Sequence, residues 1–394
     1  MQETAISENR RWLAVAALAV GAFIFNTTEY VPIALLSDIG ATFGMKPTEA
    51  GVMMAVYAAI VAFLSLPLML LTRKIERRKL LMWLFALFAA SHVLSFFAWS
   101  FNVLLASRIG IALTHAVFWS VTAALAVRIA PKGRSNQALG WLSTGSVMAM
   151  VAGIPLGRIV GQWAGWQTMF LIVGLCAAAV MAVLAKNLPL LPSVNTGSLA
   201  SLPQLFRRPN LMMLYGFTVL MITAHFTAYN YIEPFVLQVG GFAAGDVTVL
   251  LLVYGVSGFA GSFVFGKWFA KHPKMLFSGA VAVAVSAMLL MLPLSGSVWG
   301  MNALAFAWGV ALMLVSLGMQ SCVLRFASDA TDVAQSVFSG LFNVGIGGGA
   351  LLGKYAAAAL GLPNIGFSGA ALASAALLLA AVMVRRKDFF GQNG

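Results

Sequence analysis

Three side chains that are charged in water at neutral pH lie deep inside long apolar stretches of the chain, where no water solvates a charge. Glu29 and Glu233 are the acidic residues, of 11 in the chain, that lie well inside such stretches, and Arg108 is the one clearly internal base. A charge in the hydrocarbon of a bilayer costs roughly 2.5–3.5 kcal/mol on insertion scales, so such a group faces a cavity or a partner. A carboxyl group held between a nearby cation and the cost of burial can exchange a proton, which is the chemistry that these residues suggest.

Glu29 and Arg108 are predicted to lie at the same depth in a membrane. With a rise of about 1.5 Å per residue, Glu29 lies about 10 Å below the outer end of the first stretch and Arg108 about 9 Å below the outer start of the fourth. We interpret these two residues, with Glu233, as candidate proton-coupling residues. The alternatives for Glu29 are a static ion pair and a carboxylate that snorkels to the interface.

A second pattern combines imidazole, amide and aromatic groups. His225, Tyr229 and Glu233 step by four along one helix face, and Pro234 predicts a weakened helix around residue 230. Aromatic rings can stack on the apolar face of a neutral hydroxylated ligand while polar groups bind its hydroxyls. The predicted substrate-binding residues are Asn26, His115, Trp119, His225, Tyr229, Asn230, Gln320 and Asn343.

Two ordinary explanations compete with this pattern. His115 lies two helical turns after Arg108, with Trp119 one turn further, and such a histidine can simply bond a neighbouring helix. An aromatic belt at the membrane interface is the other explanation, and it suits Tyr231 better than Tyr229.

The composition determines the kind of element that must position these residues. Hydrophobic residues make up 61% of the 394 residues and charged residues only 9%. Soluble domains are roughly 45–50% apolar and about 25% charged, so a soluble enzyme and a disordered chain are both excluded. The pattern predicts an all-α membrane protein with twelve spans, at about 12–36, 48–72, 79–98, 102–128, 136–160, 165–188, 210–236, 246–270, 275–294, 298–324, 332–359 and 364–384.

Residues 189–209 form a longer, polar joint with four prolines. They predict a cytoplasmic linker between an N-terminal half of six helices (1–188) and a C-terminal half of six helices (210–394). Both halves carry a basic joint after their second helix and a glycine-rich segment in their fifth. These likenesses favour a duplicated six-helix unit, which is a common transporter design.

Lysine and arginine predict the orientation in the membrane. With the N-terminus inside, 20 of the 24 basic residues fall on the inner side, so both termini are expected in the cytoplasm. The net charge of +13 then reflects topology and contact with anionic lipids. No nucleic-acid partner is expected, and we expect a monomeric multi-pass membrane protein.

The chain shows no reactive set of side chains. It carries no Walker sequence, no metal-ligand spacing and no nucleophile with a base, and Cys176 and Cys322 lie in apolar runs. We therefore expect no enzyme activity, no cofactor and no metal. A receptor or scaffold without flux is the alternative from another class, and the charges inside the spans argue against it.

Several motifs resemble the major facilitator superfamily, and more narrowly the bacterial sugar efflux transporters of its drug–proton antiporter group. FNTTEYVPIALLSDI (25–39), ASRIGIALTHAVFWS (106–120), HFTAYNYIEPF (225–235) and FNVGIGGGALLG (342–353) carry the resemblance. ERRKLL (76–81), with Arg77 and Arg78, is similar to the end of the superfamily's loop motif. GIPLG (153–157), with Gly153, Pro155 and Gly157, resembles the antiporter motif, although Ile154 separates the glycine from the proline.

This resemblance implies alternating access, with helices 1, 4, 7 and 10 lining a central cavity. It also implies proton-driven efflux of sugars or sugar-like compounds, such as arabinose or thiogalactosides. Glu29 and Arg108 match the positions expected to couple protons, and His115, Tyr229, Asn230 and Asn343 match cavity positions. Efflux of lipophilic drugs is the alternative within the same group.

Overall fold

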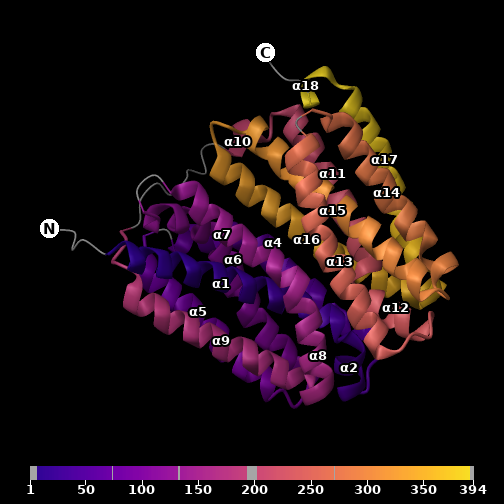
Figure 1. Cartoon of the computed structure of the whole chain (residues 1–394), viewed down its shortest axis with the longest axis horizontal. Coiled ribbons are helices and arrows are strands. Elements are labelled where there is room, and N and C mark those ends of the chain that lie inside the picture. The colour runs from indigo at the N-terminus through magenta and orange to yellow at the C-terminus, as the bar shows by residue number, and fades with distance from the viewer. Residues whose placement is uncertain (1–6, 73, 132–133, 193–201, 270, 391–394) are drawn as a thin grey trace. The chain divides into compact units, whose positions relative to one another are not determined.

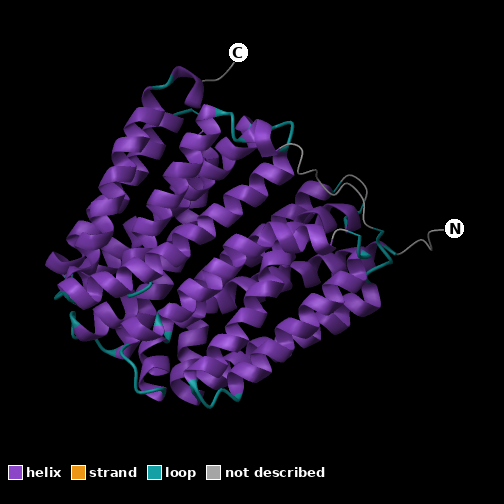
Figure 2. Ribbon diagram, turned by 180° about the vertical axis from the view of Figure 1, so that it is seen from behind, coloured by secondary structure: helices purple, strands orange, loops and turns teal. Residues whose placement is uncertain are grey.

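The computed structural model describes residues 7–72, 74–131, 134–192, 202–269 and 271–390. This part of the chain is almost entirely helical and contains no strand (Figure 2). Twelve of its helical segments are long and apolar enough to cross a membrane. The predicted all-α membrane protein with twelve transmembrane helices is therefore confirmed.

Short helices and two π-helical turns interrupt the long ones (Figure 1). The N-terminal part comprises α1 (Glu8–Ala34), α2 (Leu36–Thr42), α3 (Pro47–Ala50), α4 (Val52–Thr72), α5 (Arg77–Phe96), α6 (Phe101–Ile129), α7 (Ser135–Met148), the π-helix η1 (Ala149–Gly153), α8 (Ile154–Ala164) and α9 (Trp166–Asn187). The predicted first span thus ends at Ala34 and a separate short helix follows.

The C-terminal part follows the same plan, and its first span breaks where Pro234 predicted. It comprises α10 (Leu202–Leu205), α11 (Pro209–Tyr229), α12 (Ile232–Gln238), α13 (Ala244–Val264), the π-helix η3 (Phe265–Phe269), α14 (Pro273–Leu294), α15 (Val298–Phe326), α16 (Thr331–Leu360), the 3-10 helix η4 (Leu362–Asn364), α17 (Ile365–Arg385) and α18 (Lys387–Phe390).

Matching spans of the two parts begin with the same residue type in the same role. Ser100 precedes α6 and Ser297 precedes α15, and each hydroxyl accepts from the backbone N–H three residues on, at 3.4 and 3.1 Å. Gly165 precedes α9 and Gly361 precedes η4, with φ of 88° and 83°. Glycine fits these positions because other residues strain there. The fourth and tenth spans, and the sixth and twelfth, therefore begin in the same way.

Contacts within the chain group it into two compact units. One comprises Met1–Pro32 and Phe63–Thr196, and the other comprises Ile33–Ala62 and Gly197–Gly394. The boundary passes through α1 and α4, so the first two spans contribute to both units. Residues 193–201 of the predicted linker lie outside the described residues, and the division into halves at 189–209 stays a prediction.

Glycines of the antiporter-like motif bring the fifth span close to α1. A Cβ atom at Gly153 would collide with the side chain of Thr27, and one at Gly157 with Val31. Pro155 is the second residue of α8, directly after the π-helical turn. A proline is tolerated there because the first turn of a helix lacks partners for its N–H groups. These small residues allow the two backbones to approach.

The glycine run of α16 packs on α11 in a matching way. A Cβ atom at Gly349 would lie 2.6 Å from the Cβ of Phe226, and one at Gly353 would lie 2.7 Å from the carbonyl oxygen of Thr227. The eleventh span therefore packs on the seventh as the fifth packs on the first, through glycines. In both places the missing side chain sets the distance between the helices.

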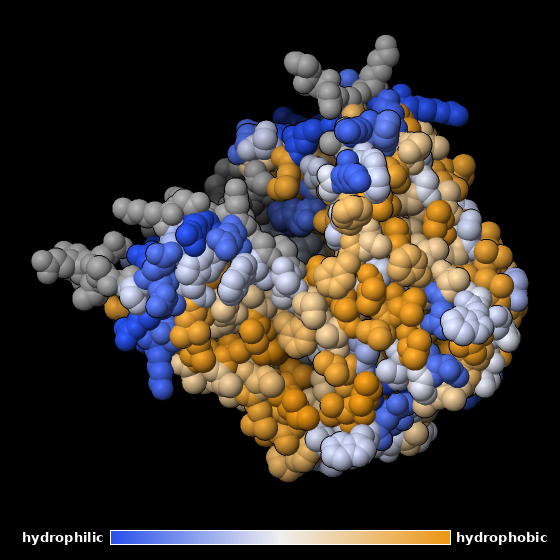
Figure 3. Space-filling view, viewed as in Figure 1, coloured by the Kyte–Doolittle hydropathy of each residue, from blue (hydrophilic) through white to orange (hydrophobic). Residues whose placement is uncertain are grey.

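The outward faces of the helices are apolar. Large hydrophobic side chains that are exposed include Phe63, Leu175, Phe263 and Leu378. Figure 3 shows such residues along the flanks of the helices and hydrophilic residues gathered at helix ends. Such flanks suit contact with lipid, so the chain is a multi-pass membrane protein.

We predict that Gly145→Ala destabilises the protein. A Cβ atom at Gly145 would collide with the backbone carbonyl of Ala19, which cannot rotate away, so α1 and α7 must separate. Overpacking of this kind costs about 1–3 kcal/mol. The thermal unfolding midpoint of the purified protein in detergent should fall.

Gly216→Ala on α11 is the matched control, because nothing lies within 4 Å of a Cβ atom there. Alanine is the better helix former, so this variant should unfold at the wild-type temperature or above. Equal midpoints for both variants would contradict the packing described for Gly145.

Candidate functional site

Glu29 pairs with His115 inside the first unit. The Glu29 carboxylate oxygen Oε2 lies 3.5 Å from His115 Nε2, and both side chains are buried. Glu29 comes from α1 and His115 from α6, so the contact joins the first and fourth spans. The protonation of one of two titratable groups this close affects the other.

Arg108 lies beside this pair and is fully buried on α6. Its Nη1 donates to the carbonyl oxygen of Thr28 at 2.8 Å and to the Thr28 hydroxyl at 3.4 Å. Thr28 directly precedes Glu29, and the Arg108 charge interacts electrostatically with the Glu29 carboxyl. The structure thus brings Glu29, His115 and Arg108 together, as the shared depth of Glu29 and Arg108 suggested.

His92 joins this cluster and is absent from the sequence-based site residues. It is fully buried on α5, with Nε2 2.8 Å from the Thr28 hydroxyl and Nδ1 2.8 Å from the carbonyl oxygen of Phe88. Its position inside an apolar span was the one signal in the sequence. No spacing within the chain relates α5 to α1, so the contact becomes visible only in the folded protein.

Trp119 contacts His115 of this cluster, and Asn26 lies on the same helix as Glu29. The Trp119 ring is half-buried and meets the His115 ring edge to face, with centroids 6.1 Å apart. Asn26 is half-buried on α1, one turn before Glu29. The predicted face of Arg108, His115 and Trp119 therefore exists on α6.

The second unit contains a cluster of aromatic rings around His225. Its imidazole stacks on Tyr229 with centroids 4.9 Å apart, and Tyr229 lies 4.5 Å from Tyr254. Trp308 meets His225 and Tyr229 edge-on, at 5.2 and 6.0 Å. The rings come from α11, α13 and α15, so three spans build the cluster.

Several polar atoms of this cluster are buried without a hydrogen-bond partner among the described residues. They are His225 Nδ1, Tyr229 OH and Trp308 Nε1, and both amide atoms of Asn230, the next residue after Tyr229 in the chain, are buried in the same way. Proteins pair more than about 90% of such groups, and an unpaired one costs about 1–3 kcal/mol. The cluster therefore offers donors and acceptors to a polar molecule.

Trp308 and Tyr254 are the residues of this cluster that the sequence did not reveal. Trp308 is one of 10 tryptophans in the chain and lies in an otherwise ordinary apolar span. Only the packing of α13 and α15 against α11 brings it to His225.

The predicted amide side chains of Asn343 and Gln320 lie in different surroundings. Asn343 Nδ2 donates to the carbonyl of Ser339 on α16 at 3.0 Å, while its Oδ1 has no partner among the described residues. Gln320 is exposed and lies twelve residues beyond Trp308 on α15, about 18 Å along the helix axis. The structure does not bring Gln320 to the aromatic cluster.

Glu233 is fully buried and binds the start of α2. Its Oε2 accepts from the Ser37 hydroxyl at 2.9 Å and from the Ser37 backbone N–H at 3.3 Å. The carboxylate thus satisfies an N–H in the first turn of α2, where helices lack internal acceptors. Glu233 and Ser37 lie in the second unit, whereas Glu29 and Arg108 lie in the first.

The arginines of the loop motif bind backbone carbonyls. Arg77 Nη1 donates to Thr72 at 3.4 Å, and Arg78 donates to the carbonyl of Ala185 at the end of α9. Glu76 accepts from the backbone N–H groups of Arg78 and Lys79 and so begins α5. These contacts give the motif a role in positioning the joint after α4.

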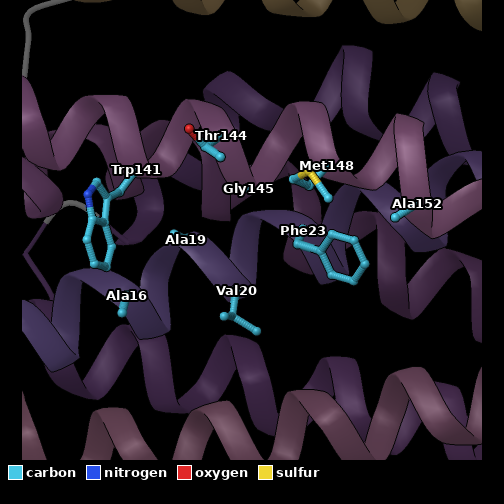
Figure 4. Close-up of a pocket in the computed structure, with 9 residues that line it drawn as sticks. All are labelled: Ala16, Ala19, Val20, Phe23, Trp141, Thr144, Gly145, Met148 and Ala152. Carbon is cyan, nitrogen blue, oxygen red and sulfur yellow. The ribbon is translucent and has the colours of Figure 1, made fainter. Parts of the chain in front are cut away.

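A pocket of about 490 Å³ lies between α1 and the fifth span in the first unit. Its lining is almost entirely apolar, and Figure 4 shows Phe23 and Val20 on one side with Trp141 and Met148 on the other. The lining residues are Ala16, Ala19, Val20, Phe23, Trp141, Thr144, Gly145, Met148 and Ala152. The predicted site residues are not among them.

The chain belongs to the Major Facilitator Superfamily, whose model matches residues 18–350. It is thus a member of a transporter family and not of an enzyme family.

Solved transporters share this fold at low sequence identity. A point mutant of the nucleoside transporter NupG has a TM-score of 0.76 at 11% identity, covering 95% of this chain and 100% of that one. A bacterial homologue of the human lysosomal transporter Spinster, inward-facing and unoccupied, has a TM-score of 0.69 at 16% identity, covering 95% and 96%. Its occupied form has a TM-score of 0.69 at 17% identity, covering 98% and 97%.

We predict that Ser37→Ala lowers stability more than Ser37→Thr. Alanine removes the hydroxyl that donates to the buried Glu233 carboxylate, whereas threonine keeps it. A hydrogen bond to a charged group contributes about 1.5–3 kcal/mol. The thermal unfolding midpoint in detergent should fall by several degrees for alanine alone, and an unchanged midpoint would show that the contact stabilises nothing.

Proposed function

We propose that the protein is a proton-coupled antiporter that exports small sugars or sugar-like compounds across the bacterial inner membrane by alternating access. The buried Glu29–His115 pair beside Arg108 carries this proposal. Ionisable groups inside a transmembrane bundle are costly, so a carboxyl–imidazole pair at this position favours a role in moving protons.

Glu29 and His115 would titrate together and carry the coupled proton. The fixed positive charge of Arg108 attracts the carboxylate form of Glu29, and a proton that enters changes the balance of charge around Arg108. Coupling requires that the two conformations of the transporter bind this proton with different affinities. Protonation from the outer side would loosen the attraction between Glu29 and Arg108 and favour one conformation.

The aromatic cluster of the second unit supports a neutral hydroxylated substrate. Tyr229 and Trp308 offer donors, Asn230 offers both a donor and an acceptor, and the rings offer flat apolar faces. A sugar can hydrogen-bond these donors and acceptors through its hydroxyls, and it can stack its C–H faces on the rings. The four rings of the cluster belong to histidine, tyrosine and tryptophan side chains and carry no carboxylate, ammonium or guanidinium group, which favours a neutral ligand over a charged one.

The distribution of lysine and arginine supports a topology with both termini in the cytoplasm. In this proposal the partners are the sugar, protons and membrane lipids. The chain acts as a monomer, needs no cofactor and binds no nucleic acid.

Glu29→Gln tests the proton role, because glutamine keeps the shape of the side chain but cannot titrate. In proteoliposomes, uphill transport of labelled arabinose or thiogalactoside driven by a pH difference should be lost. Counterflow, which exchanges internal for external sugar without net proton movement, should continue. Wild-type rates of pH-driven transport in this variant would refute the proposed coupling.

Trp308→Phe tests the substrate site. Phenylalanine keeps an aromatic ring and removes the buried N–H, so the KM for counterflow should rise by several-fold to about tenfold, as expected for one hydrogen bond. Trp299→Phe is the matched control, because Trp299 is 87% exposed. Equal KM values for both variants would place the sugar elsewhere.

The pocket between α1 and the fifth span favours a second candidate function, the export of lipophilic drugs. Phe23, Trp141 and Met148 give it an apolar and adaptable lining. A drug transporter would export a fluorescent lipophilic cation, sugars would not compete, and Met148→Asp would weaken export. A sugar transporter would show sugar counterflow and no export of the cation.

A further inference from the structure

Pro32 leaves one carbonyl of α1 without its helical donor. The helix continues from Glu8 to Ala34 through this proline, which has no N–H to give to the carbonyl of Thr28 four residues earlier. Arg108 Nη1 lies 2.8 Å from that oxygen. The guanidinium of α6 thus replaces the backbone donor that α1 lacks.

The Thr28 hydroxyl provides a second acceptor, and its direction follows from His92. Nδ1 of His92 faces the carbonyl of Phe88, which only accepts, so Nδ1 carries the proton. In the neutral ring Nε2 is then an acceptor, and the Thr28 hydroxyl donates to it at 2.8 Å. The lone pairs of that hydroxyl remain for Arg108 at 3.4 Å.

Packing holds the imidazole and the guanidinium against one ring. Phe170 of α9 lies 6.0 Å from the His92 ring and 5.9 Å from the guanidinium carbon of Arg108. A Cβ atom at Gly174 would lie 2.7 Å from the Cβ of His92, so the glycine makes room for α5. Thr28, His92 and Arg108 are all fully buried.

We propose that Thr28 and His92 are positioning residues that hold the Arg108 charge at the Glu29–His115 pair. Thr28 is the residue before Glu29, so a guanidinium bound to its carbonyl and hydroxyl has a set position relative to the carboxyl. His92 acts as a hydrogen-bond acceptor in this chain of contacts and carries no transported proton. This inference rests on the proposed function, because it assigns a task to residues around the proton-carrying pair.

The titratable groups that interact electrostatically with Arg108 among the described residues include Glu29 on α1, His92 on α5 and His115 on its own helix, and α9 presents Phe170. Displacement of the guanidinium would remove its attraction for the Glu29 carboxylate. The pH at which Glu29 is half protonated should then move upward.

Thr28→Val and His92→Phe test this inference, with Thr28→Ser and His92→Gln as matched controls. Valine keeps the shape of threonine without its hydroxyl, and phenylalanine keeps a ring without an acceptor. Serine keeps the hydroxyl, and the amide oxygen of glutamine can accept in place of Nε2. A pH titration of the carboxyl band in the infrared, with Glu29→Gln protein subtracted, reports Glu29 in the purified transporter without any substrate.

The half-protonation pH of Glu29 should rise by about half a unit or more in Thr28→Val and His92→Phe, and stay near the wild-type value in the two controls. In proteoliposomes, pH-driven transport of labelled arabinose should fall several-fold in the first two variants at neutral pH, while counterflow continues. Folded Thr28→Val and His92→Phe proteins that titrate as the wild type would overturn the inference.

Pro32→Ala provides a second variant that removes no polar group. Alanine returns an N–H to α1, and this N–H competes with Arg108 for the Thr28 carbonyl. The half-protonation pH of Glu29 should therefore rise again. An unchanged value in this folded variant would contradict the role of the carbonyl. If the wild-type protein moves no sugar while the variants still show these infrared shifts relative to it, the proposed substrate is refuted and the positioning role stands.

Discussion

A lipid bilayer offers no hydrogen-bond partner to a backbone or side chain, and this constraint explains the polar contacts of the protein. At Pro32 the helix cannot satisfy the Thr28 carbonyl, and an arginine from another span does so. At the break between α1 and α2 an exposed N–H would be costly, and the buried carboxylate of Glu233 accepts from it. Each of these irregularities in a helix thus brings a specific polar side chain with it.

The same constraint makes the aromatic cluster of the second unit unusual. There the helix breaks between Tyr229 and Ile232, and Asn230, Tyr229 and Trp308 keep buried polar atoms without partners among the described residues. These atoms lie where the seventh span breaks, and their donors and acceptors face no partner of the described protein. A site that must bind and release a polar molecule has to keep such groups available.

Glycine packing brings the spans together at two matching places. Gly153 and Gly157 bring the fifth span to α1, and Gly349 and Gly353 bring α16 to α11. At each place a side chain of the facing span occupies the space that the glycine leaves, so the two backbones approach closely and gain dispersion contacts. The helices that carry Glu29 and His225 are therefore both packed through glycine, which agrees with a transporter whose sites change between two conformations.

The sequence by itself determined the class of the protein. Its 61% hydrophobic content and its spacing of apolar runs required twelve membrane helices, because a bilayer admits few other structures. It also indicated Glu29, Arg108 and His115 as candidate site residues from their depth and spacing, since helical geometry relates residues on one span. Pro234 correctly indicated the break near residue 230, because the effect of a proline is local.

Only the tertiary structure decided which side chains meet. Glu29 contacts His115, Arg108 binds Thr28, His92 joins them from α5, and Trp308 reaches His225 from α15. Gln320 has the same chemistry as the other amides and lies away from the cluster. These outcomes depend on how one helix is rotated and shifted against another, which is set by packing across all the spans. The sequence pattern within a single span shows only which residues share a face of that helix.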